Sequence, residues 1–495
     1  MTDFYTQGPA IVGVSLVLGV CAYQLISRDK APRNSQPPGP RGLPFIGSAL
    51  DVNPADPSST FVEWERKYGE LIRCRHFGRD LFIINSERIA QDLFERRSRI
   101  YSDRAGFSAL EPYGVLFNVG MVQYGDTWRM HRKLMNGLMR RAAIPNHHDS
   151  MTNGARILVS RLKYSPERHL EHYDGYAASS IMHIVYGHDL EKDQEEIVQV
   201  LSQTASCFVE KTSDAFVALV NMFPLLKYVP AWFPGGAKFN AAKSRETISS
   251  LVSTLYGMLL RQAPEARSSY HVCAAIFVGK VETRSPTYVN ADIAVPLAGG
   301  LETTSSMLSI FVMAMMLFPE AQKRAQAEID RVLKGRPPTF EDRSSLPYVE
   351  AVMREVMRWG PVVPLGVPHC ALEDDVYEGY FIPQGTVLIA HAGSMLRNSV
   401  RYPNPEKFYP ERFLNEDGSL NNEDMGYVFG FGRRICPGRY LADASVWIAM
   451  VSILAELDIK PAVDDDGNEL VFKPEWIHAL TSRPKPFPCC IFPRI

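Results

Sequence analysis

The feature that most constrains this chain is a cysteine set in a glycine- and arginine-rich segment near the C-terminus. Residues 429–438 read FGFGRRICPG, and Cys436 is the only cysteine in the run. A thiolate that ligates a metal against an apolar wall needs backbone N–H donors and flexible glycines around it, and Gly432 and Gly438 supply the glycines. Arg434 lies two residues before the sulfur, where its guanidinium can neutralise a carboxylate such as a haem propionate. The segment therefore predicts a loop that holds Cys436 as the thiolate ligand of a haem iron.

Two other interpretations of this segment stay open on its residues alone. The first is an ordinary buried cysteine in a Gly/Arg-rich turn. The second is a phosphate-binding loop, which is disfavoured because no Gly-Lys-Ser/Thr follows the glycines. Every position of the pattern Phe-x-x-Gly-x-Arg-x-Cys-x-Gly is filled, which favours the haem interpretation. The segment resembles the haem-binding loop of the cytochrome P450 family.

Length and composition indicate one large body. The chain has 495 residues, of which 46% are hydrophobic, and no Gly/Ser-rich or charged linker interrupts it after residue 45. The net charge of -2 gives no support to nucleic-acid binding. The 8 cysteines follow neither a disulfide-like nor a zinc-like spacing. A body that faces the reducing cytosol is therefore expected.

An uncharged, mostly apolar segment at residues 10–26 predicts a membrane anchor over residues 1–27. Its 17 residues would span roughly 26 Å as a helix, enough for the thinner bilayer of the endoplasmic reticulum. One acidic residue precedes it and three basic residues follow it (Asp3, then Arg28, Lys30 and Arg33), which predicts a single-pass protein with a cytosolic body. A cleaved signal peptide is the alternative, but it lacks a basic start and a clear cleavage site.

Residues 28–45 form a basic, proline-rich hinge in this interpretation, and residues 46–495 form the catalytic domain. The run QPPGPRGLP at 36–44 predicts a stiff, non-helical connector. The order of anchor, basic stretch and Pro-Pro-Gly-Pro is similar to that of microsomal members of the P450 family.

The rest of the chain predicts a mainly helical α+β body with a few peripheral strands. A short helix is expected at 61–69, and a hairpin at 71–76 and 81–84 around the turn signal 78–80. Further strands are expected near 376–380 and 387–390. Helical periodicity elsewhere is interrupted by Pro/Gly-rich joints at 223–236 and 360–368.

A second chemical motif, PLAGGLETT at residues 296–304, lies inside a long helical pattern. Gly299 and Gly300 weaken the helix and remove side chains, which is expected to open a groove for a diatomic ligand, and Pro296 is expected to deepen the kink. Glu302 and Thr303 offer an acid and an alcohol side by side, a pair that can deliver the two protons that O–O cleavage needs. A glycine-kinked helix with an exposed glutamate is the alternative. The motif is similar to the oxygen-activating Ala/Gly-Gly-x-Asp/Glu-Thr-Thr of the P450 family, and the resemblance implies catalytic roles for Glu302 and Thr303.

Candidate partners for acidic groups of the haem lie elsewhere in the chain. Trp128 and Arg132 are four residues apart, hence on one helical face, where an indole N–H and a guanidinium can grip one carboxylate. A surface arginine over a buried tryptophan is the alternative. The spacing matches the family's Trp-x-x-x-Arg, which implies that both residues hold a haem propionate. His369 resembles the position of a further propionate partner.

A charged triad is expected to brace the core. Glu355 and Arg358 are three residues apart on a helix, and Arg412 follows 54 residues after Arg358. The set resembles the family's Glu-x-x-Arg plus Arg triad, whose role is structural. Between them the chain departs from fungal relatives, with His391-Ala392-Gly393 and Asn398-Ser399 in place of Asn-x-Trp and Asp-Pro, and local repacking is expected there.

Over nearly the whole chain, the resemblance implies a P450 fold, haem b as cofactor, and a monooxygenase that inserts one oxygen atom of O2 into a C–H bond. No flavin- or nicotinamide-binding signature is evident, so the electrons are expected from a separate NADPH–cytochrome P450 reductase. A basic face for that partner is expected from Arg129, Lys133, Arg140, Arg141, Arg433 and Arg439.

The resemblance also implies an apolar substrate pocket and hence a lipophilic substrate. Its wall is expected from Phe107, Leu110, Tyr113, Leu116, Phe117, Ala298, Gly299, Val362, Val363, Leu365, Val367, Ala479, Leu480 and Thr481. Residues 222–234 (MFPLLKYVPAWFP) are a candidate second contact with the bilayer, with a buried joint as the alternative.

Several functions remain open at this point. A haem-thiolate isomerase or dehydratase that works without O2, or a non-catalytic haem sensor, would not need the pair Glu302 and Thr303. Short motifs such as Pro410-Glu411-Arg412-Phe413 and the terminal Phe492-Pro493-Arg494 are similar to those of fungal members of the family, which often modify secondary metabolites. A terpenoid-like scaffold is favoured as substrate, and an aromatic or polyketide compound is the alternative.

Overall fold

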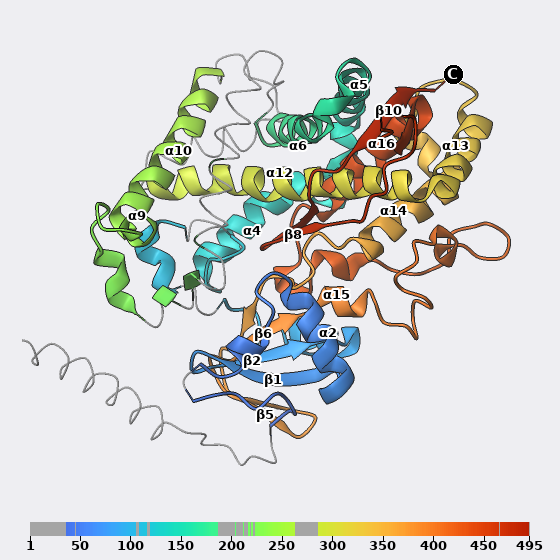
Figure 1. Cartoon of the computed structure of the whole chain (residues 1–495). Coiled ribbons are helices and arrows are strands. Elements are labelled where there is room, and N and C mark those ends of the chain that lie inside the picture. Colours follow the sequence, from blue (N-terminus) through green and yellow to red (C-terminus); the bar gives the residue numbers. More distant parts are fainter. Residues whose placement is uncertain are drawn as a thin grey trace, which may run out of the picture. The chain divides into compact units, whose positions relative to one another are not determined.

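The computed structural model describes residues 36–44, 46–104, 108–115, 119–186, 223–262, 286–464 and 466–494, and six residues between 203 and 220. The chain divides into two compact units: Met1–Ala105 with Pro368–His391, and Gly106–Val367 with Ala392–Ile495. Each unit is described by itself (Figure 1). The predicted anchor lies outside the described residues.

The smaller unit is built on a four-stranded sheet in the order β1-β2-β6-β3. Its strands are β1 (Leu71–His76), β2 (Arg79–Ile84), β6 (Val387–Ala390) and β3 (His369–Cys370), and β2 pairs antiparallel with β1 but parallel with β6. A second hairpin joins β4 (Asp375–Tyr377) to β5 (Tyr380–Ile382). The predicted first hairpin is confirmed, but its turn is Phe77–Gly78 and β2 already begins at Arg79. Both turn residues have positive φ, 48° and 80°, as the tight turns favoured between strands require.

Two helices and the proline-rich segment complete the smaller unit. Helix α2 (Pro57–Tyr68) starts earlier than predicted because Asp56 accepts a hydrogen bond from the Ser59 N–H at 3.2 Å and Pro57 occupies the first helical position. Helix α3 (Glu87–Gln91) continues into a wider turn at Asp92–Arg96. Residues 36–44 form no helix, as predicted, and the Pro38 carbonyl accepts the Arg73 N–H of β1 at 3.0 Å.

The predicted repacking around His391 is a buried polar cluster. The His391 ring has no exposed surface, and its Nε2 and Nδ1 lie 2.7 Å from Ser58 Oγ and 2.8 Å from Asn85 Oδ1. The amide oxygen of Asn85 can only accept, so Nδ1 carries the hydrogen and Nε2 accepts from the serine. The histidine thus links α2 to the end of β2.

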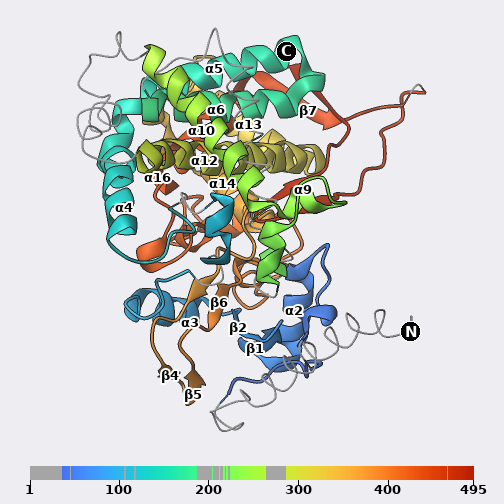
Figure 2. The ribbon, with the colours of Figure 1, turned by 90° about the vertical axis from the view of Figure 1, so that its left-hand side faces the viewer.

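The larger unit is mainly helical, as predicted. In the described parts of this unit, the α-helices are α4 (Asp126–Met139), α5 (His148–Tyr164), α6 (His169–Tyr186), α9 (Gly236–Phe239), α10 (Ala241–Gln262), α12 (Pro286–Leu317), α13 (Pro319–Leu333), α14 (Pro347–Trp359), α15 (Ala392–Met395) and α16 (Arg439–Glu456). Two antiparallel pairs complete it: β7 (Leu457–Pro461) with β10 (Cys489–Pro493), and β8 (Trp476–His478) with β9 (Ser482–Pro484). The chain between β7 and β8 extends far from the helices (Figure 2).

Helix α12 is the axis of the larger unit. It lies between α5 and α6 on one side and α14 on the other, and it continues through Pro296 without interruption. Among the described residues, the segment Gly299–Leu317 alone is long and apolar enough to cross a membrane, with a mean hydropathy of 1.4, yet 72% of it is buried inside the unit. The apolar character of this segment therefore reflects its place in the core, which it shares with the fully buried Trp447 of α16.

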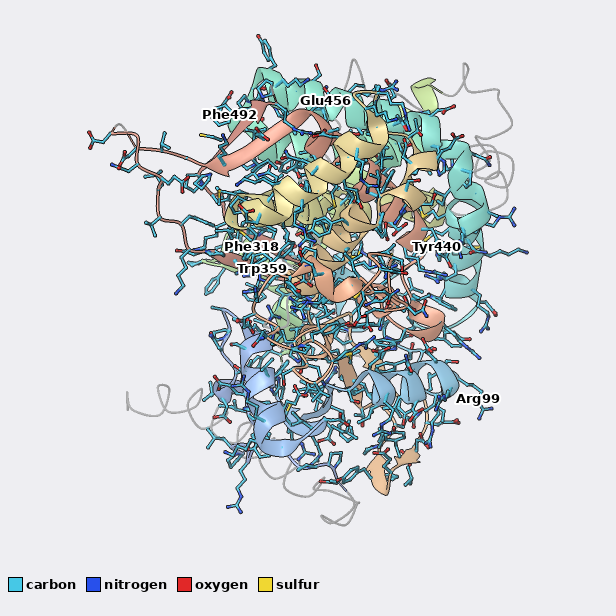
Figure 3. The ribbon with its side chains drawn as sticks, turned by 90° about the vertical axis from the view of Figure 1, so that its right-hand side faces the viewer. Arg99, Phe318, Trp359, Tyr440, Glu456 and Phe492 are labelled. Atoms are coloured by element: carbon cyan, nitrogen blue, oxygen red, sulfur yellow. The ribbon has the colours of Figure 1, made fainter. Side chains whose placement is uncertain are left out.

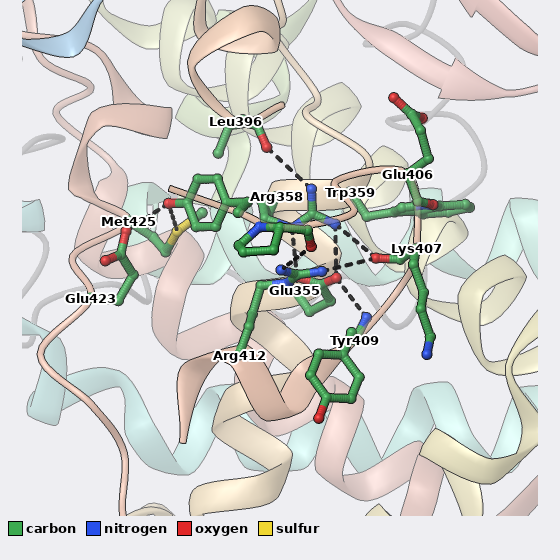
Figure 4. A network of polar contacts seen from close by, with 12 residues as sticks. Glu355, Arg358, Trp359, Leu396, Glu406, Lys407, Tyr409, Arg412, Glu423 and Met425 are labelled. Carbon is green, nitrogen blue, oxygen red and sulfur yellow. Dashed lines mark hydrogen bonds and ion pairs between the residues drawn. The ribbon is translucent and has the colours of Figure 1, made fainter. Parts of the chain in front are cut away.

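The predicted charged triad is confirmed as a buried network (Figure 4). Glu355 and Arg358 of α14 have no exposed surface and form a double hydrogen bond, Arg358 Nε to Oε2 at 2.7 Å and Nη2 to Oε1 at 2.8 Å. Arg412 Nε donates to the same Oε2 at 3.1 Å, and the Tyr409 N–H donates to Oε1 at 2.7 Å. One carboxylate thus holds two guanidinium groups and the backbone of a distant loop.

An aromatic cluster lies beside this network. The rings of Phe318 and Trp359 meet edge to face at 5.7 Å (Figure 3), and Trp359 lies 6.0 Å from Trp476 of β8. The Trp359 indole N–H donates to the Glu406 carbonyl at 3.2 Å. The cluster connects the ends of α12 and α14 to the β8–β9 hairpin.

Candidate active site

The loop that carries Cys436 is closed on itself directly before α16. The Cys436 N–H donates to the Phe429 carbonyl at 2.8 Å, and Gly430 and Gly432 have φ values of 86° and 55°. Only glycine adopts such angles readily, so the flexibility predicted at Gly432 is required. Gly438 has an ordinary φ of -88° and occupies the N-cap of α16. A Cβ at Gly438 would lie 3.8 Å from Met139 Sδ and 3.9 Å from Cys436 Sγ, which are ordinary van der Waals distances. Contacts within the chain therefore do not require a glycine at this position.

The charges around Cys436 favour its thiolate. Burial is the largest influence on the pKa of this thiol and raises it, whereas the Gly438 N–H, Arg132 and Arg439 act to lower it. Arg439 Nη1 also donates to the Cys436 carbonyl at 3.1 Å. The sulfur therefore lies among one backbone donor and two cations, which is the setting that a ligating thiolate needs.

Three of the predicted cofactor residues meet beside this loop. Trp128 and Arg132 share α4, as their spacing predicts, and Arg132 Nη1 donates to the Ile435 carbonyl at 2.6 Å. Arg434 lies over the Trp128 ring at 4.7 Å and donates to the Val119 and Val122 carbonyls at 3.2 and 2.8 Å. The fold thus gathers two guanidinium groups and an indole next to Cys436.

Arg132 is the member of this cluster that is available for a further anionic partner. Burial lowers the pKa of the Arg132 guanidinium, which is half-buried. Within the part of the chain that the structure describes, no carboxylate pairs with Arg132; its contacts are a carbonyl and the Trp128 ring at 5.8 Å. Apart from the Cys436 sulfur, the partners of this half-buried cation are neutral, so it is suited to an anionic group that the described part of the chain does not provide.

The two glycines of α12 have different roles. Among the described residues, a Cβ at Gly299 would meet nothing within 4 Å, whereas a Cβ at Gly300 would lie 2.5 Å from Ile181 Cδ1 of α6. Only Gly299 therefore borders open space, and Gly300 allows α6 and α12 to approach closely. The groove for a diatomic ligand therefore stays a prediction at Gly299, whereas Gly300 packs against α6 instead.

We expect alanine to have opposite effects at these two positions. Gly299→Ala should leave stability unchanged or raise it by up to about 1 kcal/mol, because alanine favours the helix and has room. Gly300→Ala should lower stability by about 1–3 kcal/mol, because Ile181 must move within a packed interface. Thermal unfolding of the two variants measures the difference. Equal effects would contradict the roles assigned to the glycines.

The predicted acid and alcohol are both engaged in hydrogen bonds. Thr303 Oγ1 donates to the Gly299 carbonyl at 2.7 Å, a bond that locally loosens a helix. Glu302 Oε1 accepts a short hydrogen bond from Thr481 Oγ1 in the turn between β8 and β9. The sequence suggests Thr481 only as a pocket-wall residue, and nothing in it predicts this bond between residues 179 positions apart.

His369 belongs to the smaller unit, apart from the other candidates. It is buried in β3, its Nδ1 donates to the Tyr101 carbonyl at 2.7 Å, and its ring stacks on Phe94 at 4.1 Å. The carbonyl partner fixes the hydrogen on Nδ1. Its predicted contact with a propionate stays a prediction.

The predicted pocket wall is described only in part. Phe107, Leu116 and Phe117 and the side chain of Ala298 lie outside the described residues. Leu110 and Tyr113 are fully buried, and burial raises the pKa of Tyr113 to about 12. Val362 and Thr481 are also buried, and Ala479 is exposed. The wall therefore stays a prediction.

Comparison with known proteins identifies the family. The Cytochrome P450 family model matches residues 37–491, which span both units. The chain belongs to the cytochrome P450 family. Cytochrome P450 monooxygenase 176 of Postia placenta is 35% identical over 476 residues, 94% of this chain and 91% of that protein.

Two further relatives match over comparable lengths. Cytochrome P450 monooxygenase COX2 of Coprinopsis cinerea is 34% identical over 498 residues, 98% of this chain and 94% of that protein. Tryptamine 4-monooxygenase of Psilocybe cyanescens is 34% identical over 496 residues, 97% of each chain. The protein is therefore a cytochrome P450 monooxygenase with haem b as its cofactor, which confirms the enzyme class and cofactor predicted from the sequence.

Proposed function

We propose that the enzyme uses Cys436 as its iron ligand and oxidises a lipophilic small molecule with O2 and electrons from an NADPH–cytochrome P450 reductase. One observation carries the assignment of the site: Cys436 lies in a closed glycine loop with the cations Arg132 and Arg439 acting on its sulfur. When bound, the haem supplies the activation of O2. The residues of the chain then bind, orient and supply protons.

Each candidate residue has one task in this proposal. Arg132 and Arg434, which both lie over the Trp128 ring, hold the propionates of the haem together with the Trp128 indole N–H, because guanidinium and indole N–H groups donate to carboxylates. His369 is the further propionate partner. Gly299 leaves room on α12 for O2, and Glu302 and Thr303 supply protons from their carboxyl and hydroxyl oxygens.

We propose a terpenoid-like substrate from fungal secondary metabolism. The predicted wall is almost entirely apolar, and the relatives come from fungi. An aromatic amine is a second candidate, supported by the relative named for its action on tryptamine. Binding of either class can be followed by the shift of the Soret band that a ligand causes as it displaces water from the haem pocket.

The purified enzyme and a P450 reductase should be offered one panel of sesquiterpenes and another of indole amines. We expect a product that carries one oxygen atom from O2 and that requires NADPH. The proposal would be contradicted if neither panel gave a product with oxygen from O2 while a hydroperoxide was converted at equal rates with and without NADPH.

We further propose that the enzyme is anchored in the endoplasmic reticulum membrane by residues 10–26, with its body in the cytosol and a second membrane contact at residues 222–234. Large apolar side chains are exposed there: Trp232 is 82% exposed, Leu225 77% and Tyr228 70%. Indole and phenol rings favour the interface between lipid and water. An exposed apolar patch of this kind is suited to partial insertion into the surface of a lipid bilayer.

In vesicles, the emission of Trp232 should shift to the blue and be quenched by brominated lipids. The difference between the wild type and Trp232→Phe isolates the signal of this residue. A matched control moves the tryptophan elsewhere, with Tyr164→Trp in the Trp232→Phe background, because Tyr164 is 92% exposed on α5. We expect no quenching in the control. Equal quenching at both sites, or none at Trp232, would contradict the second contact.

A further inference from the structure

The carboxylate of Glu302 has one neutral partner in the described part of the chain. Glu302 is half-buried on α12, and its Oε1 accepts from Thr481 Oγ1. Among the described residues, no lysine, arginine or histidine pairs with it. A half-buried carboxylate without a cation can turn toward water unless another group holds it, and Thr481 is the group that does so here.

Thr481 is well suited to hold a side chain in place because it is itself fixed. It is 7% exposed in the turn between β8 and β9, where its carbonyl accepts the Ala479 N–H at 2.9 Å. The neighbouring Ser482 N–H donates to the Val362 carbonyl at 2.6 Å, which ties the hairpin to the segment after α14. The hydroxyl therefore projects from a rigid support.

A second hydrogen bond on α12, close to Glu302, joins this helix to α6. Ser305, three residues after Glu302, donates to Asp174 Oδ1 of α6 at 2.5 Å. Burial raises the pKa of Asp174, and Arg483 of β9 acts to lower it. The hairpin therefore contacts α12 through the bond from Thr481 to Glu302, and the charge of Arg483 also acts on Asp174, the partner of Ser305.

We propose that Thr481 is a positioning residue of the proton relay, whose hydroxyl holds the Glu302 carboxylate in one orientation on α12 and prevents it from turning to solvent. The proposal rests on the relay assigned to Glu302 and Thr303 in the proposed function. Thr303 itself donates to the Gly299 carbonyl, so its oxygen keeps lone pairs to accept a proton from the acid. Without Thr481, the acid and the alcohol remain, but their relative placement is lost.

The test compares Thr481→Val, which keeps the shape and removes the hydroxyl, with Thr481→Ser, which keeps the hydroxyl. Ser482→Ala is the matched control, because its hydroxyl lies on the same hairpin but pairs with His478 Nδ1 at 3.0 Å. The full-length holoenzymes are examined with CO as a probe, since the infrared C–O stretch of bound CO reports the polar groups around it. Peroxide released per NADPH is measured with a P450 reductase.

In Thr481→Val, we expect a shifted C–O band and a roughly tenfold rise in peroxide per NADPH, below the roughly 10²–10⁴-fold that a whole acid catalyst contributes. Thr481→Ser and Ser482→Ala should match the wild type. Added to Glu302→Ala, Thr481→Val should have no further effect, because Thr481 acts through Glu302.

A Thr481→Val enzyme that matches the wild type in both measurements would overturn the proposal. So would equal effects of Thr481→Val and Ser482→Ala, which would indicate a general role of the hairpin. Failure of the proposed function is distinguishable, because the wild-type CO complex itself would then lack the red-shifted Soret band of thiolate ligation.

Discussion

Glu355→Gln should remove most of the stability of the folded enzyme, by about 3–5 kcal/mol out of the roughly 5–15 kcal/mol typical of a native protein. The substitution keeps the size of the side chain but removes its charge. Arg358, which has no exposed surface, and Arg412, which is 8% exposed, would then be buried cations without a counter-charge. A single amide oxygen cannot replace the four hydrogen bonds that the carboxylate accepts.

Denaturant unfolding of the purified full-length protein, followed by circular dichroism and haem absorbance, measures this loss. Glu320→Gln is the matched control, because Glu320 pairs with Lys323 at 2.8 Å on the surface and its side chain is 80% exposed. The control should change stability by at most about 1 kcal/mol. A Glu355→Gln enzyme as stable as the control would show that the network does not brace the core.

Glu302→Gln should lower the productive use of NADPH by about 10²-fold, the lower end of what a positioned acid contributes. The glutamine keeps an oxygen that can accept from Thr481, so the hairpin contact survives while the proton is lost. Thr303→Ala should act in the same direction, because it removes the hydroxyl that passes the proton on. In both variants, a larger share of the NADPH consumed should go into the reduction of O2 to peroxide.

The measurement is the ratio of peroxide to NADPH, with O2 uptake recorded in parallel. Thr303→Ser is the control, since it keeps a hydroxyl at the same place and should retain most of the coupling. If Glu302→Gln and Thr303→Ala keep the wild-type ratio, neither residue belongs to a proton relay.

The local elements were predictable because their signals are local. Three features depend on spacings of a few residues, which fix geometry locally: the pairing of the first hairpin, the shared face of Trp128 and Arg132, and the pair Glu355 and Arg358. The turn of the hairpin lies one residue earlier than predicted, at Phe77–Gly78. The loop around Cys436 was predictable because each position of its motif is filled and Gly432 needs the positive φ of 55°. Helix α2 begins four residues before the predicted start, because Asp56 caps it and Pro57 occupies its first position.

Contacts between distant segments could not be predicted in this way. The bond between Glu302 and Thr481 and the cluster of His391 with Ser58 and Asn85 join residues far apart in the chain. The different roles of Gly299 and Gly300 depend on where α6 packs, which no periodicity in α12 reveals. The sequence pattern therefore predicts which residues carry the chemistry of the site, but not the long-range contacts that hold those residues in place.

The most direct test of the central claim is the absorption spectrum of the reduced, CO-bound enzyme, recorded for the wild type and for Cys436→Ser. Serine keeps the backbone bond from residue 436 to the Phe429 carbonyl but provides no thiolate. We expect a strongly red-shifted Soret band in the wild type and its loss in the variant. A band typical of histidine ligation in the folded wild type, or a red-shifted band that survives in Cys436→Ser, would contradict the assignment of Cys436 as the iron ligand.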